Sequence, residues 1–207
     1  MSKGTVTVFG GSGFLGRYVV RRLANLGWTI RVAVRRPSRA AFLQPLGDVG
    51  QITPLACDVR DAAQVQRALA GSQAVVNLVG ILYEEGRQSF AAVQYQGAKT
   101  VATAAAALGI TQFVQISALG VSPQSSSDYS RSKAAAEQAV LAAIPQARIV
   151  RPSIIFGAED DFFNRFAGLA RLSPFLPLIG GGHSCFQPVY VGDVADGIVT
   201  ALDSAAS

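Results

Sequence analysis

Tyr129 and Lys133 lie four residues apart in the stretch SSSDYSRSKAAAEQAV, at the start of a predicted helix. Side chains at this spacing share one face of a helix. An ammonium group beside a phenol favours the phenolate and lowers the pKa of the phenol toward the working range. The phenol can then give or take a proton while a hydride moves to or from a carbonyl carbon, and the lysine can also hold a nicotinamide ribose. The pair therefore predicts acid–base chemistry at a carbonyl group.

Three glycines, Gly10, Gly13 and Gly16, join the first predicted strand to the first predicted helix in the stretch VFGGSGFLGRYVV. A glycine triplet alone is a weak signal, because any tight turn needs small residues. Between a strand and a helix, however, it is typical of a dinucleotide-binding turn. Side chains at these positions would keep a pyrophosphate away from the free N–H groups at the helix N-terminus. The context therefore predicts a dinucleotide cofactor.

The end of the second predicted strand bears on the choice of cofactor. An NAD site usually places a carboxylate about 20 residues after the glycines, where it binds the ribose 2′-hydroxyl. No acidic residue occurs between positions 17 and 47, and the stretch VAVRRPSR sets Arg35, Arg36 and Arg39 near that place. A guanidinium binds a 2′-phosphate through charge-assisted hydrogen bonds, whereas a carboxylate repels it. The alternative is a solvated basic turn. NADP(H) is favoured, and NAD(H) stays open.

Two further strand ends should reach the same crevice, because ligands bind at the carboxyl ends of the strands in such sheets. Asp58 follows the third predicted strand in ACDVRD and could accept a hydrogen bond from an adenine amino group. It could equally cap the following helix, and Asp61 competes for that position. The segment NLVG ends the fourth strand with Gly80, which lets the backbone pass close to a cofactor.

Segments with strand and helix patterns alternate along the chain. The predicted strands cover 5–9, 29–34, 51–57, 74–80, 112–117 and 147–153, and the predicted helices cover about 14–26, 61–71, 88–108 and 129–143. Long helices between strands imply crossover connections, and hence a parallel sheet with helices on both faces. Pro54 would cost the third strand a ladder hydrogen bond, so this strand should lie at an edge. The predicted fold class is α/β, a doubly wound parallel sheet or Rossmann fold.

The composition predicts one globular domain over residues 1–207. Half of the residues are apolar and only 15% are charged, which argues against a disordered chain. The net charge is +5, and no helix carries a basic stripe interleaved with aromatic residues. No nucleic-acid partner is therefore expected.

The sparse histidine and cysteine content excludes several kinds of site. His183 is the only histidine, so a histidine-based triad and a zinc site with several imidazoles are excluded, and no metal is expected. Cys57 and Cys185 fit no metal or redox spacing and are expected to be unpaired thiols. The first strand begins too close to Met1 for a signal peptide, and no apolar run is long enough to span a bilayer. We expect a cytoplasmic protein, with a peripheral position at the inner membrane as the alternative.

The glycine loop, Asp58, NLVG and YSRSK follow one another in the order of the short-chain dehydrogenase/reductase superfamily, and the resemblance covers the whole chain. The stretch RPSIIFGAEDDFFNRFAGLARLSPFLPLIGGG, followed by QPVYVGDV, is similar to the NAD(P)H-binding accessory subunits of respiratory complex I. It is also similar to their bacterial relatives, which are described as nucleoside-diphosphate-sugar epimerases. The resemblance implies that residues 152–192 contribute to a substrate-side region that is short or truncated.

The resemblance also implies roles for individual residues. Tyr129 would be the acid and base, and Lys133 its modulator and the ribose anchor. The implied cofactor-binding set is Gly10, Gly11, Ser12, Gly13, Phe14, Leu15, Gly16, Arg35, Arg36, Arg39, Asp58, Val59, Leu78, Val79, Gly80, Tyr129, Lys133 and Pro152.

The sequence departs from this superfamily at the expected hydroxyl donor. Extended members carry serines after the fifth strand, one of which polarises the substrate carbonyl, whereas this chain reads QISALGVS. Ala118 and Leu119 stand at the expected positions, so Ser117 becomes the candidate catalytic hydroxyl, with Ser122 or no donor as alternatives. Loss of one such donor typically costs about a hundredfold or more in rate.

Three functions are compatible with these features. The first is an NAD(P)(H)-dependent oxidoreductase or epimerase that acts on an unknown carbonyl or nucleotide-sugar substrate. The second is a non-catalytic accessory or assembly subunit of a membrane-associated respiratory or quinone-biosynthesis complex, with DFFNRF and SPFLPLIGG as candidate contacts. The alternative for these two segments is packing against a further C-terminal part. The third is a redox sensor, which the Tyr129–Lys133 pair disfavours.

Overall fold

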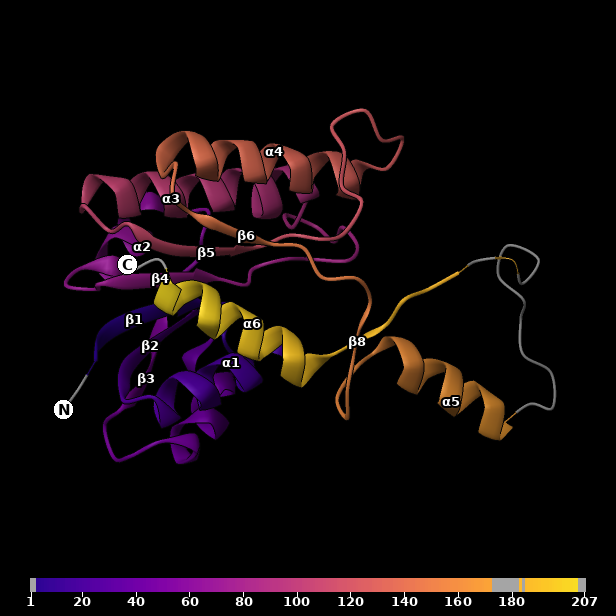
Figure 1. Ribbon diagram of the computed structural model, residues 1–207, viewed down its shortest axis with the longest axis horizontal. Coiled ribbons are helices and arrows are strands. Elements are labelled where there is room, and N and C mark those ends of the chain that lie inside the picture. The colour runs from indigo at the N-terminus through magenta and orange to yellow at the C-terminus, as the bar shows by residue number, and fades with distance from the viewer. Residues whose placement is uncertain (1–2, 173–182, 184, 205–207) are drawn as a thin grey trace.

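A sheet of six parallel strands lies at the centre of the computed structural model, which describes residues 3–172, 183 and 185–204 (Figure 1). The order across the sheet is β3-β2-β1-β4-β5-β6. The strands are β1 Gly4–Phe9, β2 Trp28–Val34, β3 Ile52–Ala56, β4 Ala74–Asn77, β5 Gln112–Ile116 and β6 Arg148–Val150. The order reverses between β1 and β4, and ligands of such sheets bind at that switch point. The predicted doubly wound α/β fold is confirmed.

Helices cover both faces of the sheet (Figure 1). On one face lie α1 Phe14–Asn25 and α6 Val191–Ser204, and on the other lie α2 Ala62–Leu69, α3 Gly97–Ala107 and α4 Asp128–Ala143. Each layer has its own apolar core: Val8 of β1 packs toward α1 and α6, and the adjacent Phe9 packs toward the other layer. This division follows from the period of two in a strand.

Two strands illustrate how the sequence dictates their places. All four residues of β4 are buried, as expected for a central strand of a parallel sheet. Pro54 lies in β3, and β3 is an edge strand, as predicted. An open edge tolerates the missing backbone N–H of proline.

The structure differs from the predicted elements in three main respects. The Ala-rich segment predicted as one helix begins as a π-helix, η2 Phe90–Gln96, which continues directly into α3. A π-helical turn is rare in proteins, and where it does occur it often lies at a functional site. A 3-10 helix, η1 Pro37–Leu46, follows β2 where no element was predicted. The fourth strand also ends three residues early, because residues 78–80 leave the sheet and line a cavity.

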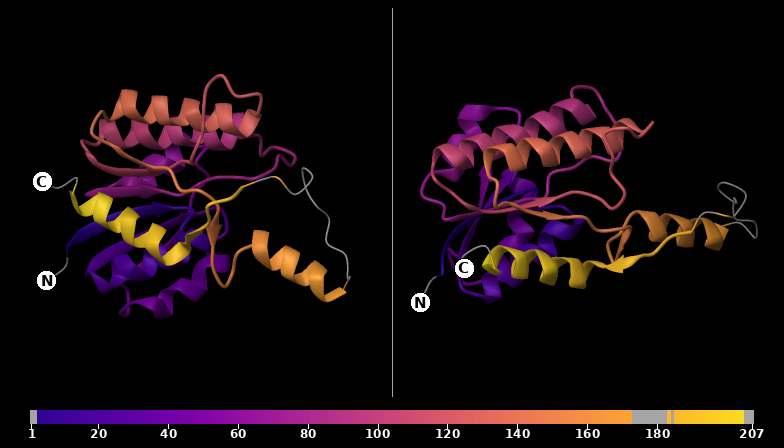
Figure 2. Two further views of the ribbon diagram at one scale, coloured as in Figure 1. Left: turned by 45° about the vertical axis from the view of Figure 1, so that its right-hand side comes forward. Right: turned by 45° about the horizontal axis from the view of Figure 1, so that its top comes forward.

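A smaller substructure extends away from the main sheet (Figure 2). The short strands β7 Ile155–Phe156 and β8 Val189–Tyr190 pair with each other, and α5 Phe162–Leu172 projects beyond them. The segments SPFLPLIGG and GGGH fall on 173–183, of which only His183, an exposed residue, is among the described residues. Within the described part of the chain, no helix combines the length and apolarity needed to cross a membrane.

Candidate functional site

The glycine loop makes a tight turn between β1 and α1. Gly10 has a φ of +76°, which favours glycine, and its carbonyl accepts a hydrogen bond from Gly13 N at 3.1 Å. A Cβ atom on Gly16 would lie 2.5 Å from Gly11 O, too close for any side chain. Gly13 caps α1 without a side-chain acceptor. The first N–H groups of α1 are therefore available to an anion.

A cavity of about 270 Å³ lies where the first four strands of the sheet end. Nine of the predicted cofactor residues line it, namely Gly10, Ser12, Gly13, Arg35, Asp58, Val59, Leu78, Val79 and Gly80. The lining also contains residues that the sequence did not single out, namely Ala33, Val34, Cys57, Arg60, Ile81, Gln88 and Val93. The cavity lies at the switch point of the sheet, where dinucleotides bind in this fold.

Four predicted residues support the loop from behind the cavity. Gly11 and Gly16 are buried, and Leu15 packs against the apolar core. Phe14 is half-buried, and a Cβ atom on Gly157 would lie 3.2 Å from its ring. These residues bring α1 close to the strands and to the substrate-side segment.

The remaining predicted cofactor residues lie elsewhere. Arg36 and Arg39 are exposed and do not line the cavity. Pro152 lines a second cavity of about 490 Å³ together with Arg151, Ser153 and Asp193. Of the three arginines proposed for a 2′-phosphate, the structure therefore brings Arg35 to the cavity.

Asp58 and Asp61 have separate roles. Asp61 caps α2, since its carboxylate accepts hydrogen bonds from Ala63 N and Gln64 N at 3.0 and 3.1 Å. Asp58 faces the cavity, and its carboxylate accepts hydrogen bonds from Arg60 Nε at 2.9 Å and from the second guanidinium nitrogen at 2.5 Å. These bonds lower the pKa of Asp58. The sequence signal for this ion pair is the spacing in ACDVRD, where Arg60 follows Asp58 by two residues.

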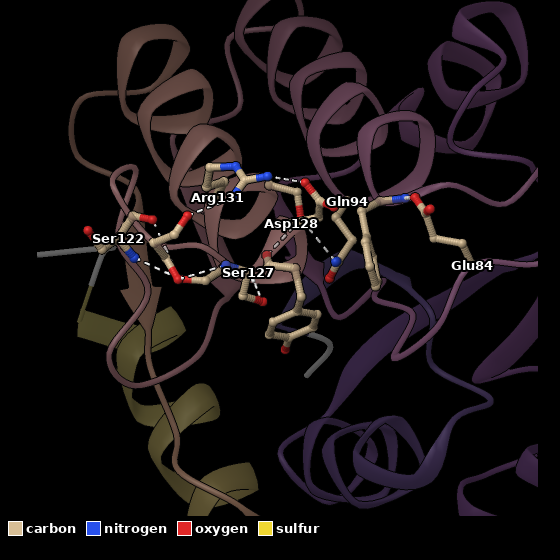
Figure 3. A network of polar contacts seen from close by, with 11 residues as sticks. Glu84, Gln94, Ser122, Ser127, Asp128 and Arg131 are labelled. Carbon is tan, nitrogen blue, oxygen red and sulfur yellow. Dashed lines mark hydrogen bonds and ion pairs between the residues drawn. The ribbon is translucent and has the colours of Figure 1, made fainter.

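The loop between β4 and η2 closes one wall of the cavity through two arginines. Arg35 donates a hydrogen bond to the Gln88 side chain, and Arg60 donates one to Arg87 O at 2.7 Å. Glu84 accepts a hydrogen bond from Phe90 N at 2.6 Å, which fixes the start of η2 (Figure 3). Sequence alone could not predict the two arginine contacts, because they join residues 53 and 27 positions apart.

Tyr129 is half-buried at the start of α4, and its ring packs edge-on against Phe90, with centroids 5.8 Å apart. Burial raises the pKa of its phenol. This direction is opposite to the one expected from a neighbouring lysine alone. The phenol is therefore protonated at neutral pH, and burial alone makes it a weaker acid.

Lys133 lies one turn further along α4, with only 4% of its surface exposed. Its ammonium donates a long hydrogen bond of 3.4 Å to Ile116 O. A Cβ atom on Gly80 would lie 3.3 Å from Lys133 Nζ, so the ammonium reaches the cavity wall at Gly80. Burial lowers the pKa of Lys133 to about 8, against the charge of Glu137, which raises it.

The two candidate hydroxyl donors lie apart from each other. Ser117 is 5% exposed, and its hydroxyl lies close enough to Glu137 to help lower the pKa of that carboxyl, although it has no hydrogen-bond partner of ordinary geometry. Ser122 donates a hydrogen bond to the Gln124 side chain at 3.0 Å. Ser117 thus faces a carboxylate inside the protein.

The start of α4 is held by a polar network, which Figure 3 shows. Ser127 is the N-cap, and its hydroxyl accepts a hydrogen bond from Ser130 N. Arg131 pairs with Asp128 and donates a hydrogen bond to Ser125 O at 2.6 Å. These contacts fix the helical turn that carries Tyr129.

The arrangement fits a nicotinamide dinucleotide. The glycine cradle that a Cβ would fill and the helix N-terminus suit the pyrophosphate of such a molecule. No cluster of three or more potential metal ligands occurs among the described residues. Cys57, in the cavity wall, has its pKa raised to about 11 by burial, so it is a neutral thiol there.

Comparison with known proteins gives a family match over residues 6–207, to the family described as NAD dependent epimerase/dehydratase. Among curated proteins, the chain is 43% identical over 198 residues to NADH dehydrogenase (ubiquinone) 1 alpha subcomplex subunit 9 of Arabidopsis thaliana mitochondria, covering 95% of this chain and 49% of that protein. It is 38% identical over 204 residues to ceramide reductase of Caulobacter vibrioides, covering 96% of this chain and 61% of that protein. The chain thus spans about half to three-fifths of the length of these relatives.

Solved structures share the fold at lower identity. UDP-N-acetylglucosamine 4-epimerase from Bacillus cereus superposes with a TM-score of 0.73 at 19% identity, over 98% of this chain and 72% of that chain. The Bordetella bronchiseptica enzyme WbmH, solved in complex with NAD+, also has a TM-score of 0.73 at 19% identity, over 97% of this chain and 72% of that one.

Proposed function

The chain belongs to the NAD-dependent epimerase/dehydratase family, and we propose that it binds NADP(H) at the glycine loop and acts as an oxidoreductase or epimerase. The observation that carries this proposal is the cavity at the switch point of the sheet, which the glycine loop and Arg35 line together. Residues 1–207 would form one dinucleotide-binding domain, with about 152–192 contributing to the substrate side.

The preference for NADP(H) over NAD(H) rests on the end of β2. Arg35 lines the cavity, and its present partner is the neutral amide of Gln88. A phosphate would be a stronger partner, because it adds attraction between opposite charges and can accept two parallel hydrogen bonds from the guanidinium. No acidic residue occurs between positions 17 and 47, the stretch that contains the end of β2, to bind a free 2′-hydroxyl.

The proposed chemistry uses two side chains of α4. A bound nicotinamide supplies or accepts the hydride. Tyr129, whose pKa is raised by burial, would donate its phenolic proton to the oxygen of a carbonyl that is being reduced, and would take it back in the reverse direction. Lys133 would hold the ribose at Gly80 and place a positive charge near the phenol.

The test of cofactor binding needs no knowledge of the substrate. The purified protein is denatured, and any released nucleotide is identified by mass and by the absorbance of reduced nicotinamide. Protein freed of nucleotide is then titrated with NADPH and NADH. We expect tighter binding of NADPH. Failure to bind either nucleotide would refute the proposal.

A second candidate function is that of an accessory subunit that holds the nucleotide as a structural element. Its support is the 43% identity to a subunit of mitochondrial NADH dehydrogenase and the buried position of Ser117, away from solvent. Such a protein would sit at the membrane as part of a respiratory or quinone-linked complex. The exposed aromatic side chains of α5, Phe162 and Phe163, are candidate contacts.

The variant Tyr129→Phe separates the two functions. Under the enzyme proposal, turnover falls by about a hundredfold or more, because the proton donor is lost, while the affinity for NADPH stays within about twofold. Under the accessory proposal, the variant supports cellular function as well as the wild type does. A complementation assay in a strain that lacks the protein measures this difference.

A further inference from the structure

Three polar side chains form a nearly solvent-free cluster next to the proposed nicotinamide end of the site. Ser117, Lys133 and Glu137 are 5%, 4% and 7% exposed. Ser117 follows β5, and the other two lie on α4. Arg151, which follows β6, reaches this cluster from the side of the second cavity and is about half exposed. A group of charges removed from water in this way is costly unless the charges compensate one another.

Glu137 is the only negative charge in the cluster, and Arg151 holds it in a fixed orientation. Arg151 Nε donates to one carboxylate oxygen at 2.8 Å, and a second guanidinium nitrogen donates to the other at 2.5 Å. Burial alone would raise the pKa of Glu137, but the bonds from Arg151 and the charges of Arg151 and Lys133 bring it below the usual value. Glu137 is therefore a carboxylate at neutral pH.

Lys133 has the charge of Glu137 nearby, without a direct ion pair between the two side chains, and it makes few hydrogen bonds of its own. Its one hydrogen bond among the described residues, to Ile116 O, is 3.4 Å long, although an ammonium has three protons to donate. Glu137 follows it by four residues, so both side chains share one face of α4. The other titratable groups on elements packed against α4 are Tyr129 itself, Tyr95 of η2 and the exposed Lys99 of α3.

We propose that Glu137 is a positioning residue, which Arg151 clamps in place and which holds Lys133 as a charged group against Gly80. This proposal rests on the proposed function, because it gives Lys133 the task of anchoring the nicotinamide ribose. It also assigns Ser117 to the support of this carboxylate. A plain structural ion pair between Arg151 and Glu137 would leave the charge of Lys133 unaffected by substitution of Glu137.

The first experiment measures Lys133 directly, without a cofactor. The chain contains three lysines, Lys3, Lys99 and Lys133, so protein labelled with 13C-lysine gives a small set of Cε signals whose shifts report each ammonium as pH is varied. We expect a wild-type midpoint for Lys133 of about 8. In Glu137→Gln the midpoint should fall by about one pH unit or more, because the compensating charge is gone.

Glu85→Gln is the matched control, since Glu85 is exposed and the substitution removes the same charge. It should leave the Lys133 midpoint in place. A folded Glu137→Gln protein with an unchanged Lys133 midpoint would overturn the proposal.

Arg151→Gln provides a second variant, which keeps the carboxylate and removes its clamp. The freed carboxylate can turn away from Lys133, so the Lys133 midpoint should fall, although less than in Glu137→Gln. An unchanged or raised midpoint would overturn the proposal. This variant decides the matter if Glu137→Gln does not fold, and it alters a side chain that is about half exposed.

Binding measurements with two ligands show which end of the cofactor is affected by the loss of Glu137. Glu137→Gln should weaken NADPH binding at pH 8 by about tenfold, and should leave binding of adenosine 2′,5′-bisphosphate, which lacks the nicotinamide riboside, unchanged. Equal loss for both ligands would overturn the assignment to the nicotinamide end. If the wild type binds neither ligand, the proposed function fails, whereas the lysine titration still tests the role of Glu137.

Discussion

At the scale of single residues, Arg35 is the side chain on which the choice of nucleotide should depend. Arg35→Gln should weaken NADPH binding by about 10- to 100-fold, because a hydrogen bond to a charged group is worth about 1.5–3 kcal/mol, and should change NADH binding little. Fluorescence titration of the two nucleotides measures the ratio.

The matched control for Arg35 is Arg39→Gln. Arg39 has the same charge as Arg35 and is also exposed, but it does not line the cavity. The Arg39→Gln variant should keep the wild-type ratio of NADPH affinity to NADH affinity. Equal effects of the two substitutions would favour a general effect of positive charge over a specific phosphate contact.

Lys133 should lower the free energy of unfolding at neutral pH, because it is a buried ammonium group. Its pKa is about 8 in the folded protein against an ordinary value of 10.5. The unfolded chain therefore holds more protons between these values, and stability should rise as pH increases through this window. Lys133→Met should raise the free energy of unfolding at pH 7 by up to about 3 kcal/mol and lose this pH dependence. Urea unfolding at pH 7 and pH 9.5 provides the measurement, and equal stability at pH 7 would contradict the prediction.

At the scale of elements, α2 depends on one of the two aspartates between which the sequence could not choose. Asp61→Ala should cost about 1 kcal/mol, because two N–H groups lose their acceptor. Asp48→Ala, at an exposed position, should cost less than about 0.5 kcal/mol. Thermal unfolding compares the two, and equal losses would show that α2 does not rely on this cap.

At the scale of the whole molecule, the cofactor should stabilise the fold by binding the folded state alone. NADPH at 100 times its dissociation constant should add about 2.7 kcal/mol to the free energy of unfolding. Gly16→Ala should reduce this gain, because its Cβ would lie 2.5 Å from Gly11 O and disturb the loop. Calorimetry with and without nucleotide measures the gain, and an equal gain in the variant would contradict a role for the loop.

The sequence by itself determined the fold class and predicted where the candidate site should lie. Alternating strand and helix patterns require a doubly wound sheet, Pro54 requires an edge strand, and a glycine triplet between a strand and a helix marks the crevice. These features are local, because each depends on backbone geometry or on residues within one turn or one strand. Nine lining residues of the main cavity were predicted for this reason.

Only the tertiary structure decided which side chains meet. It brought Arg35 to the cavity and left Arg36 and Arg39 outside the cavity lining, because neighbouring residues of a turn point in different directions. It also turned Ser117 toward Glu137 and set Arg151 on that carboxylate. Contacts between separate strands and helices depend on how the layers pack, and packing decides burial, which in turn sets the pKa of Tyr129 and Lys133.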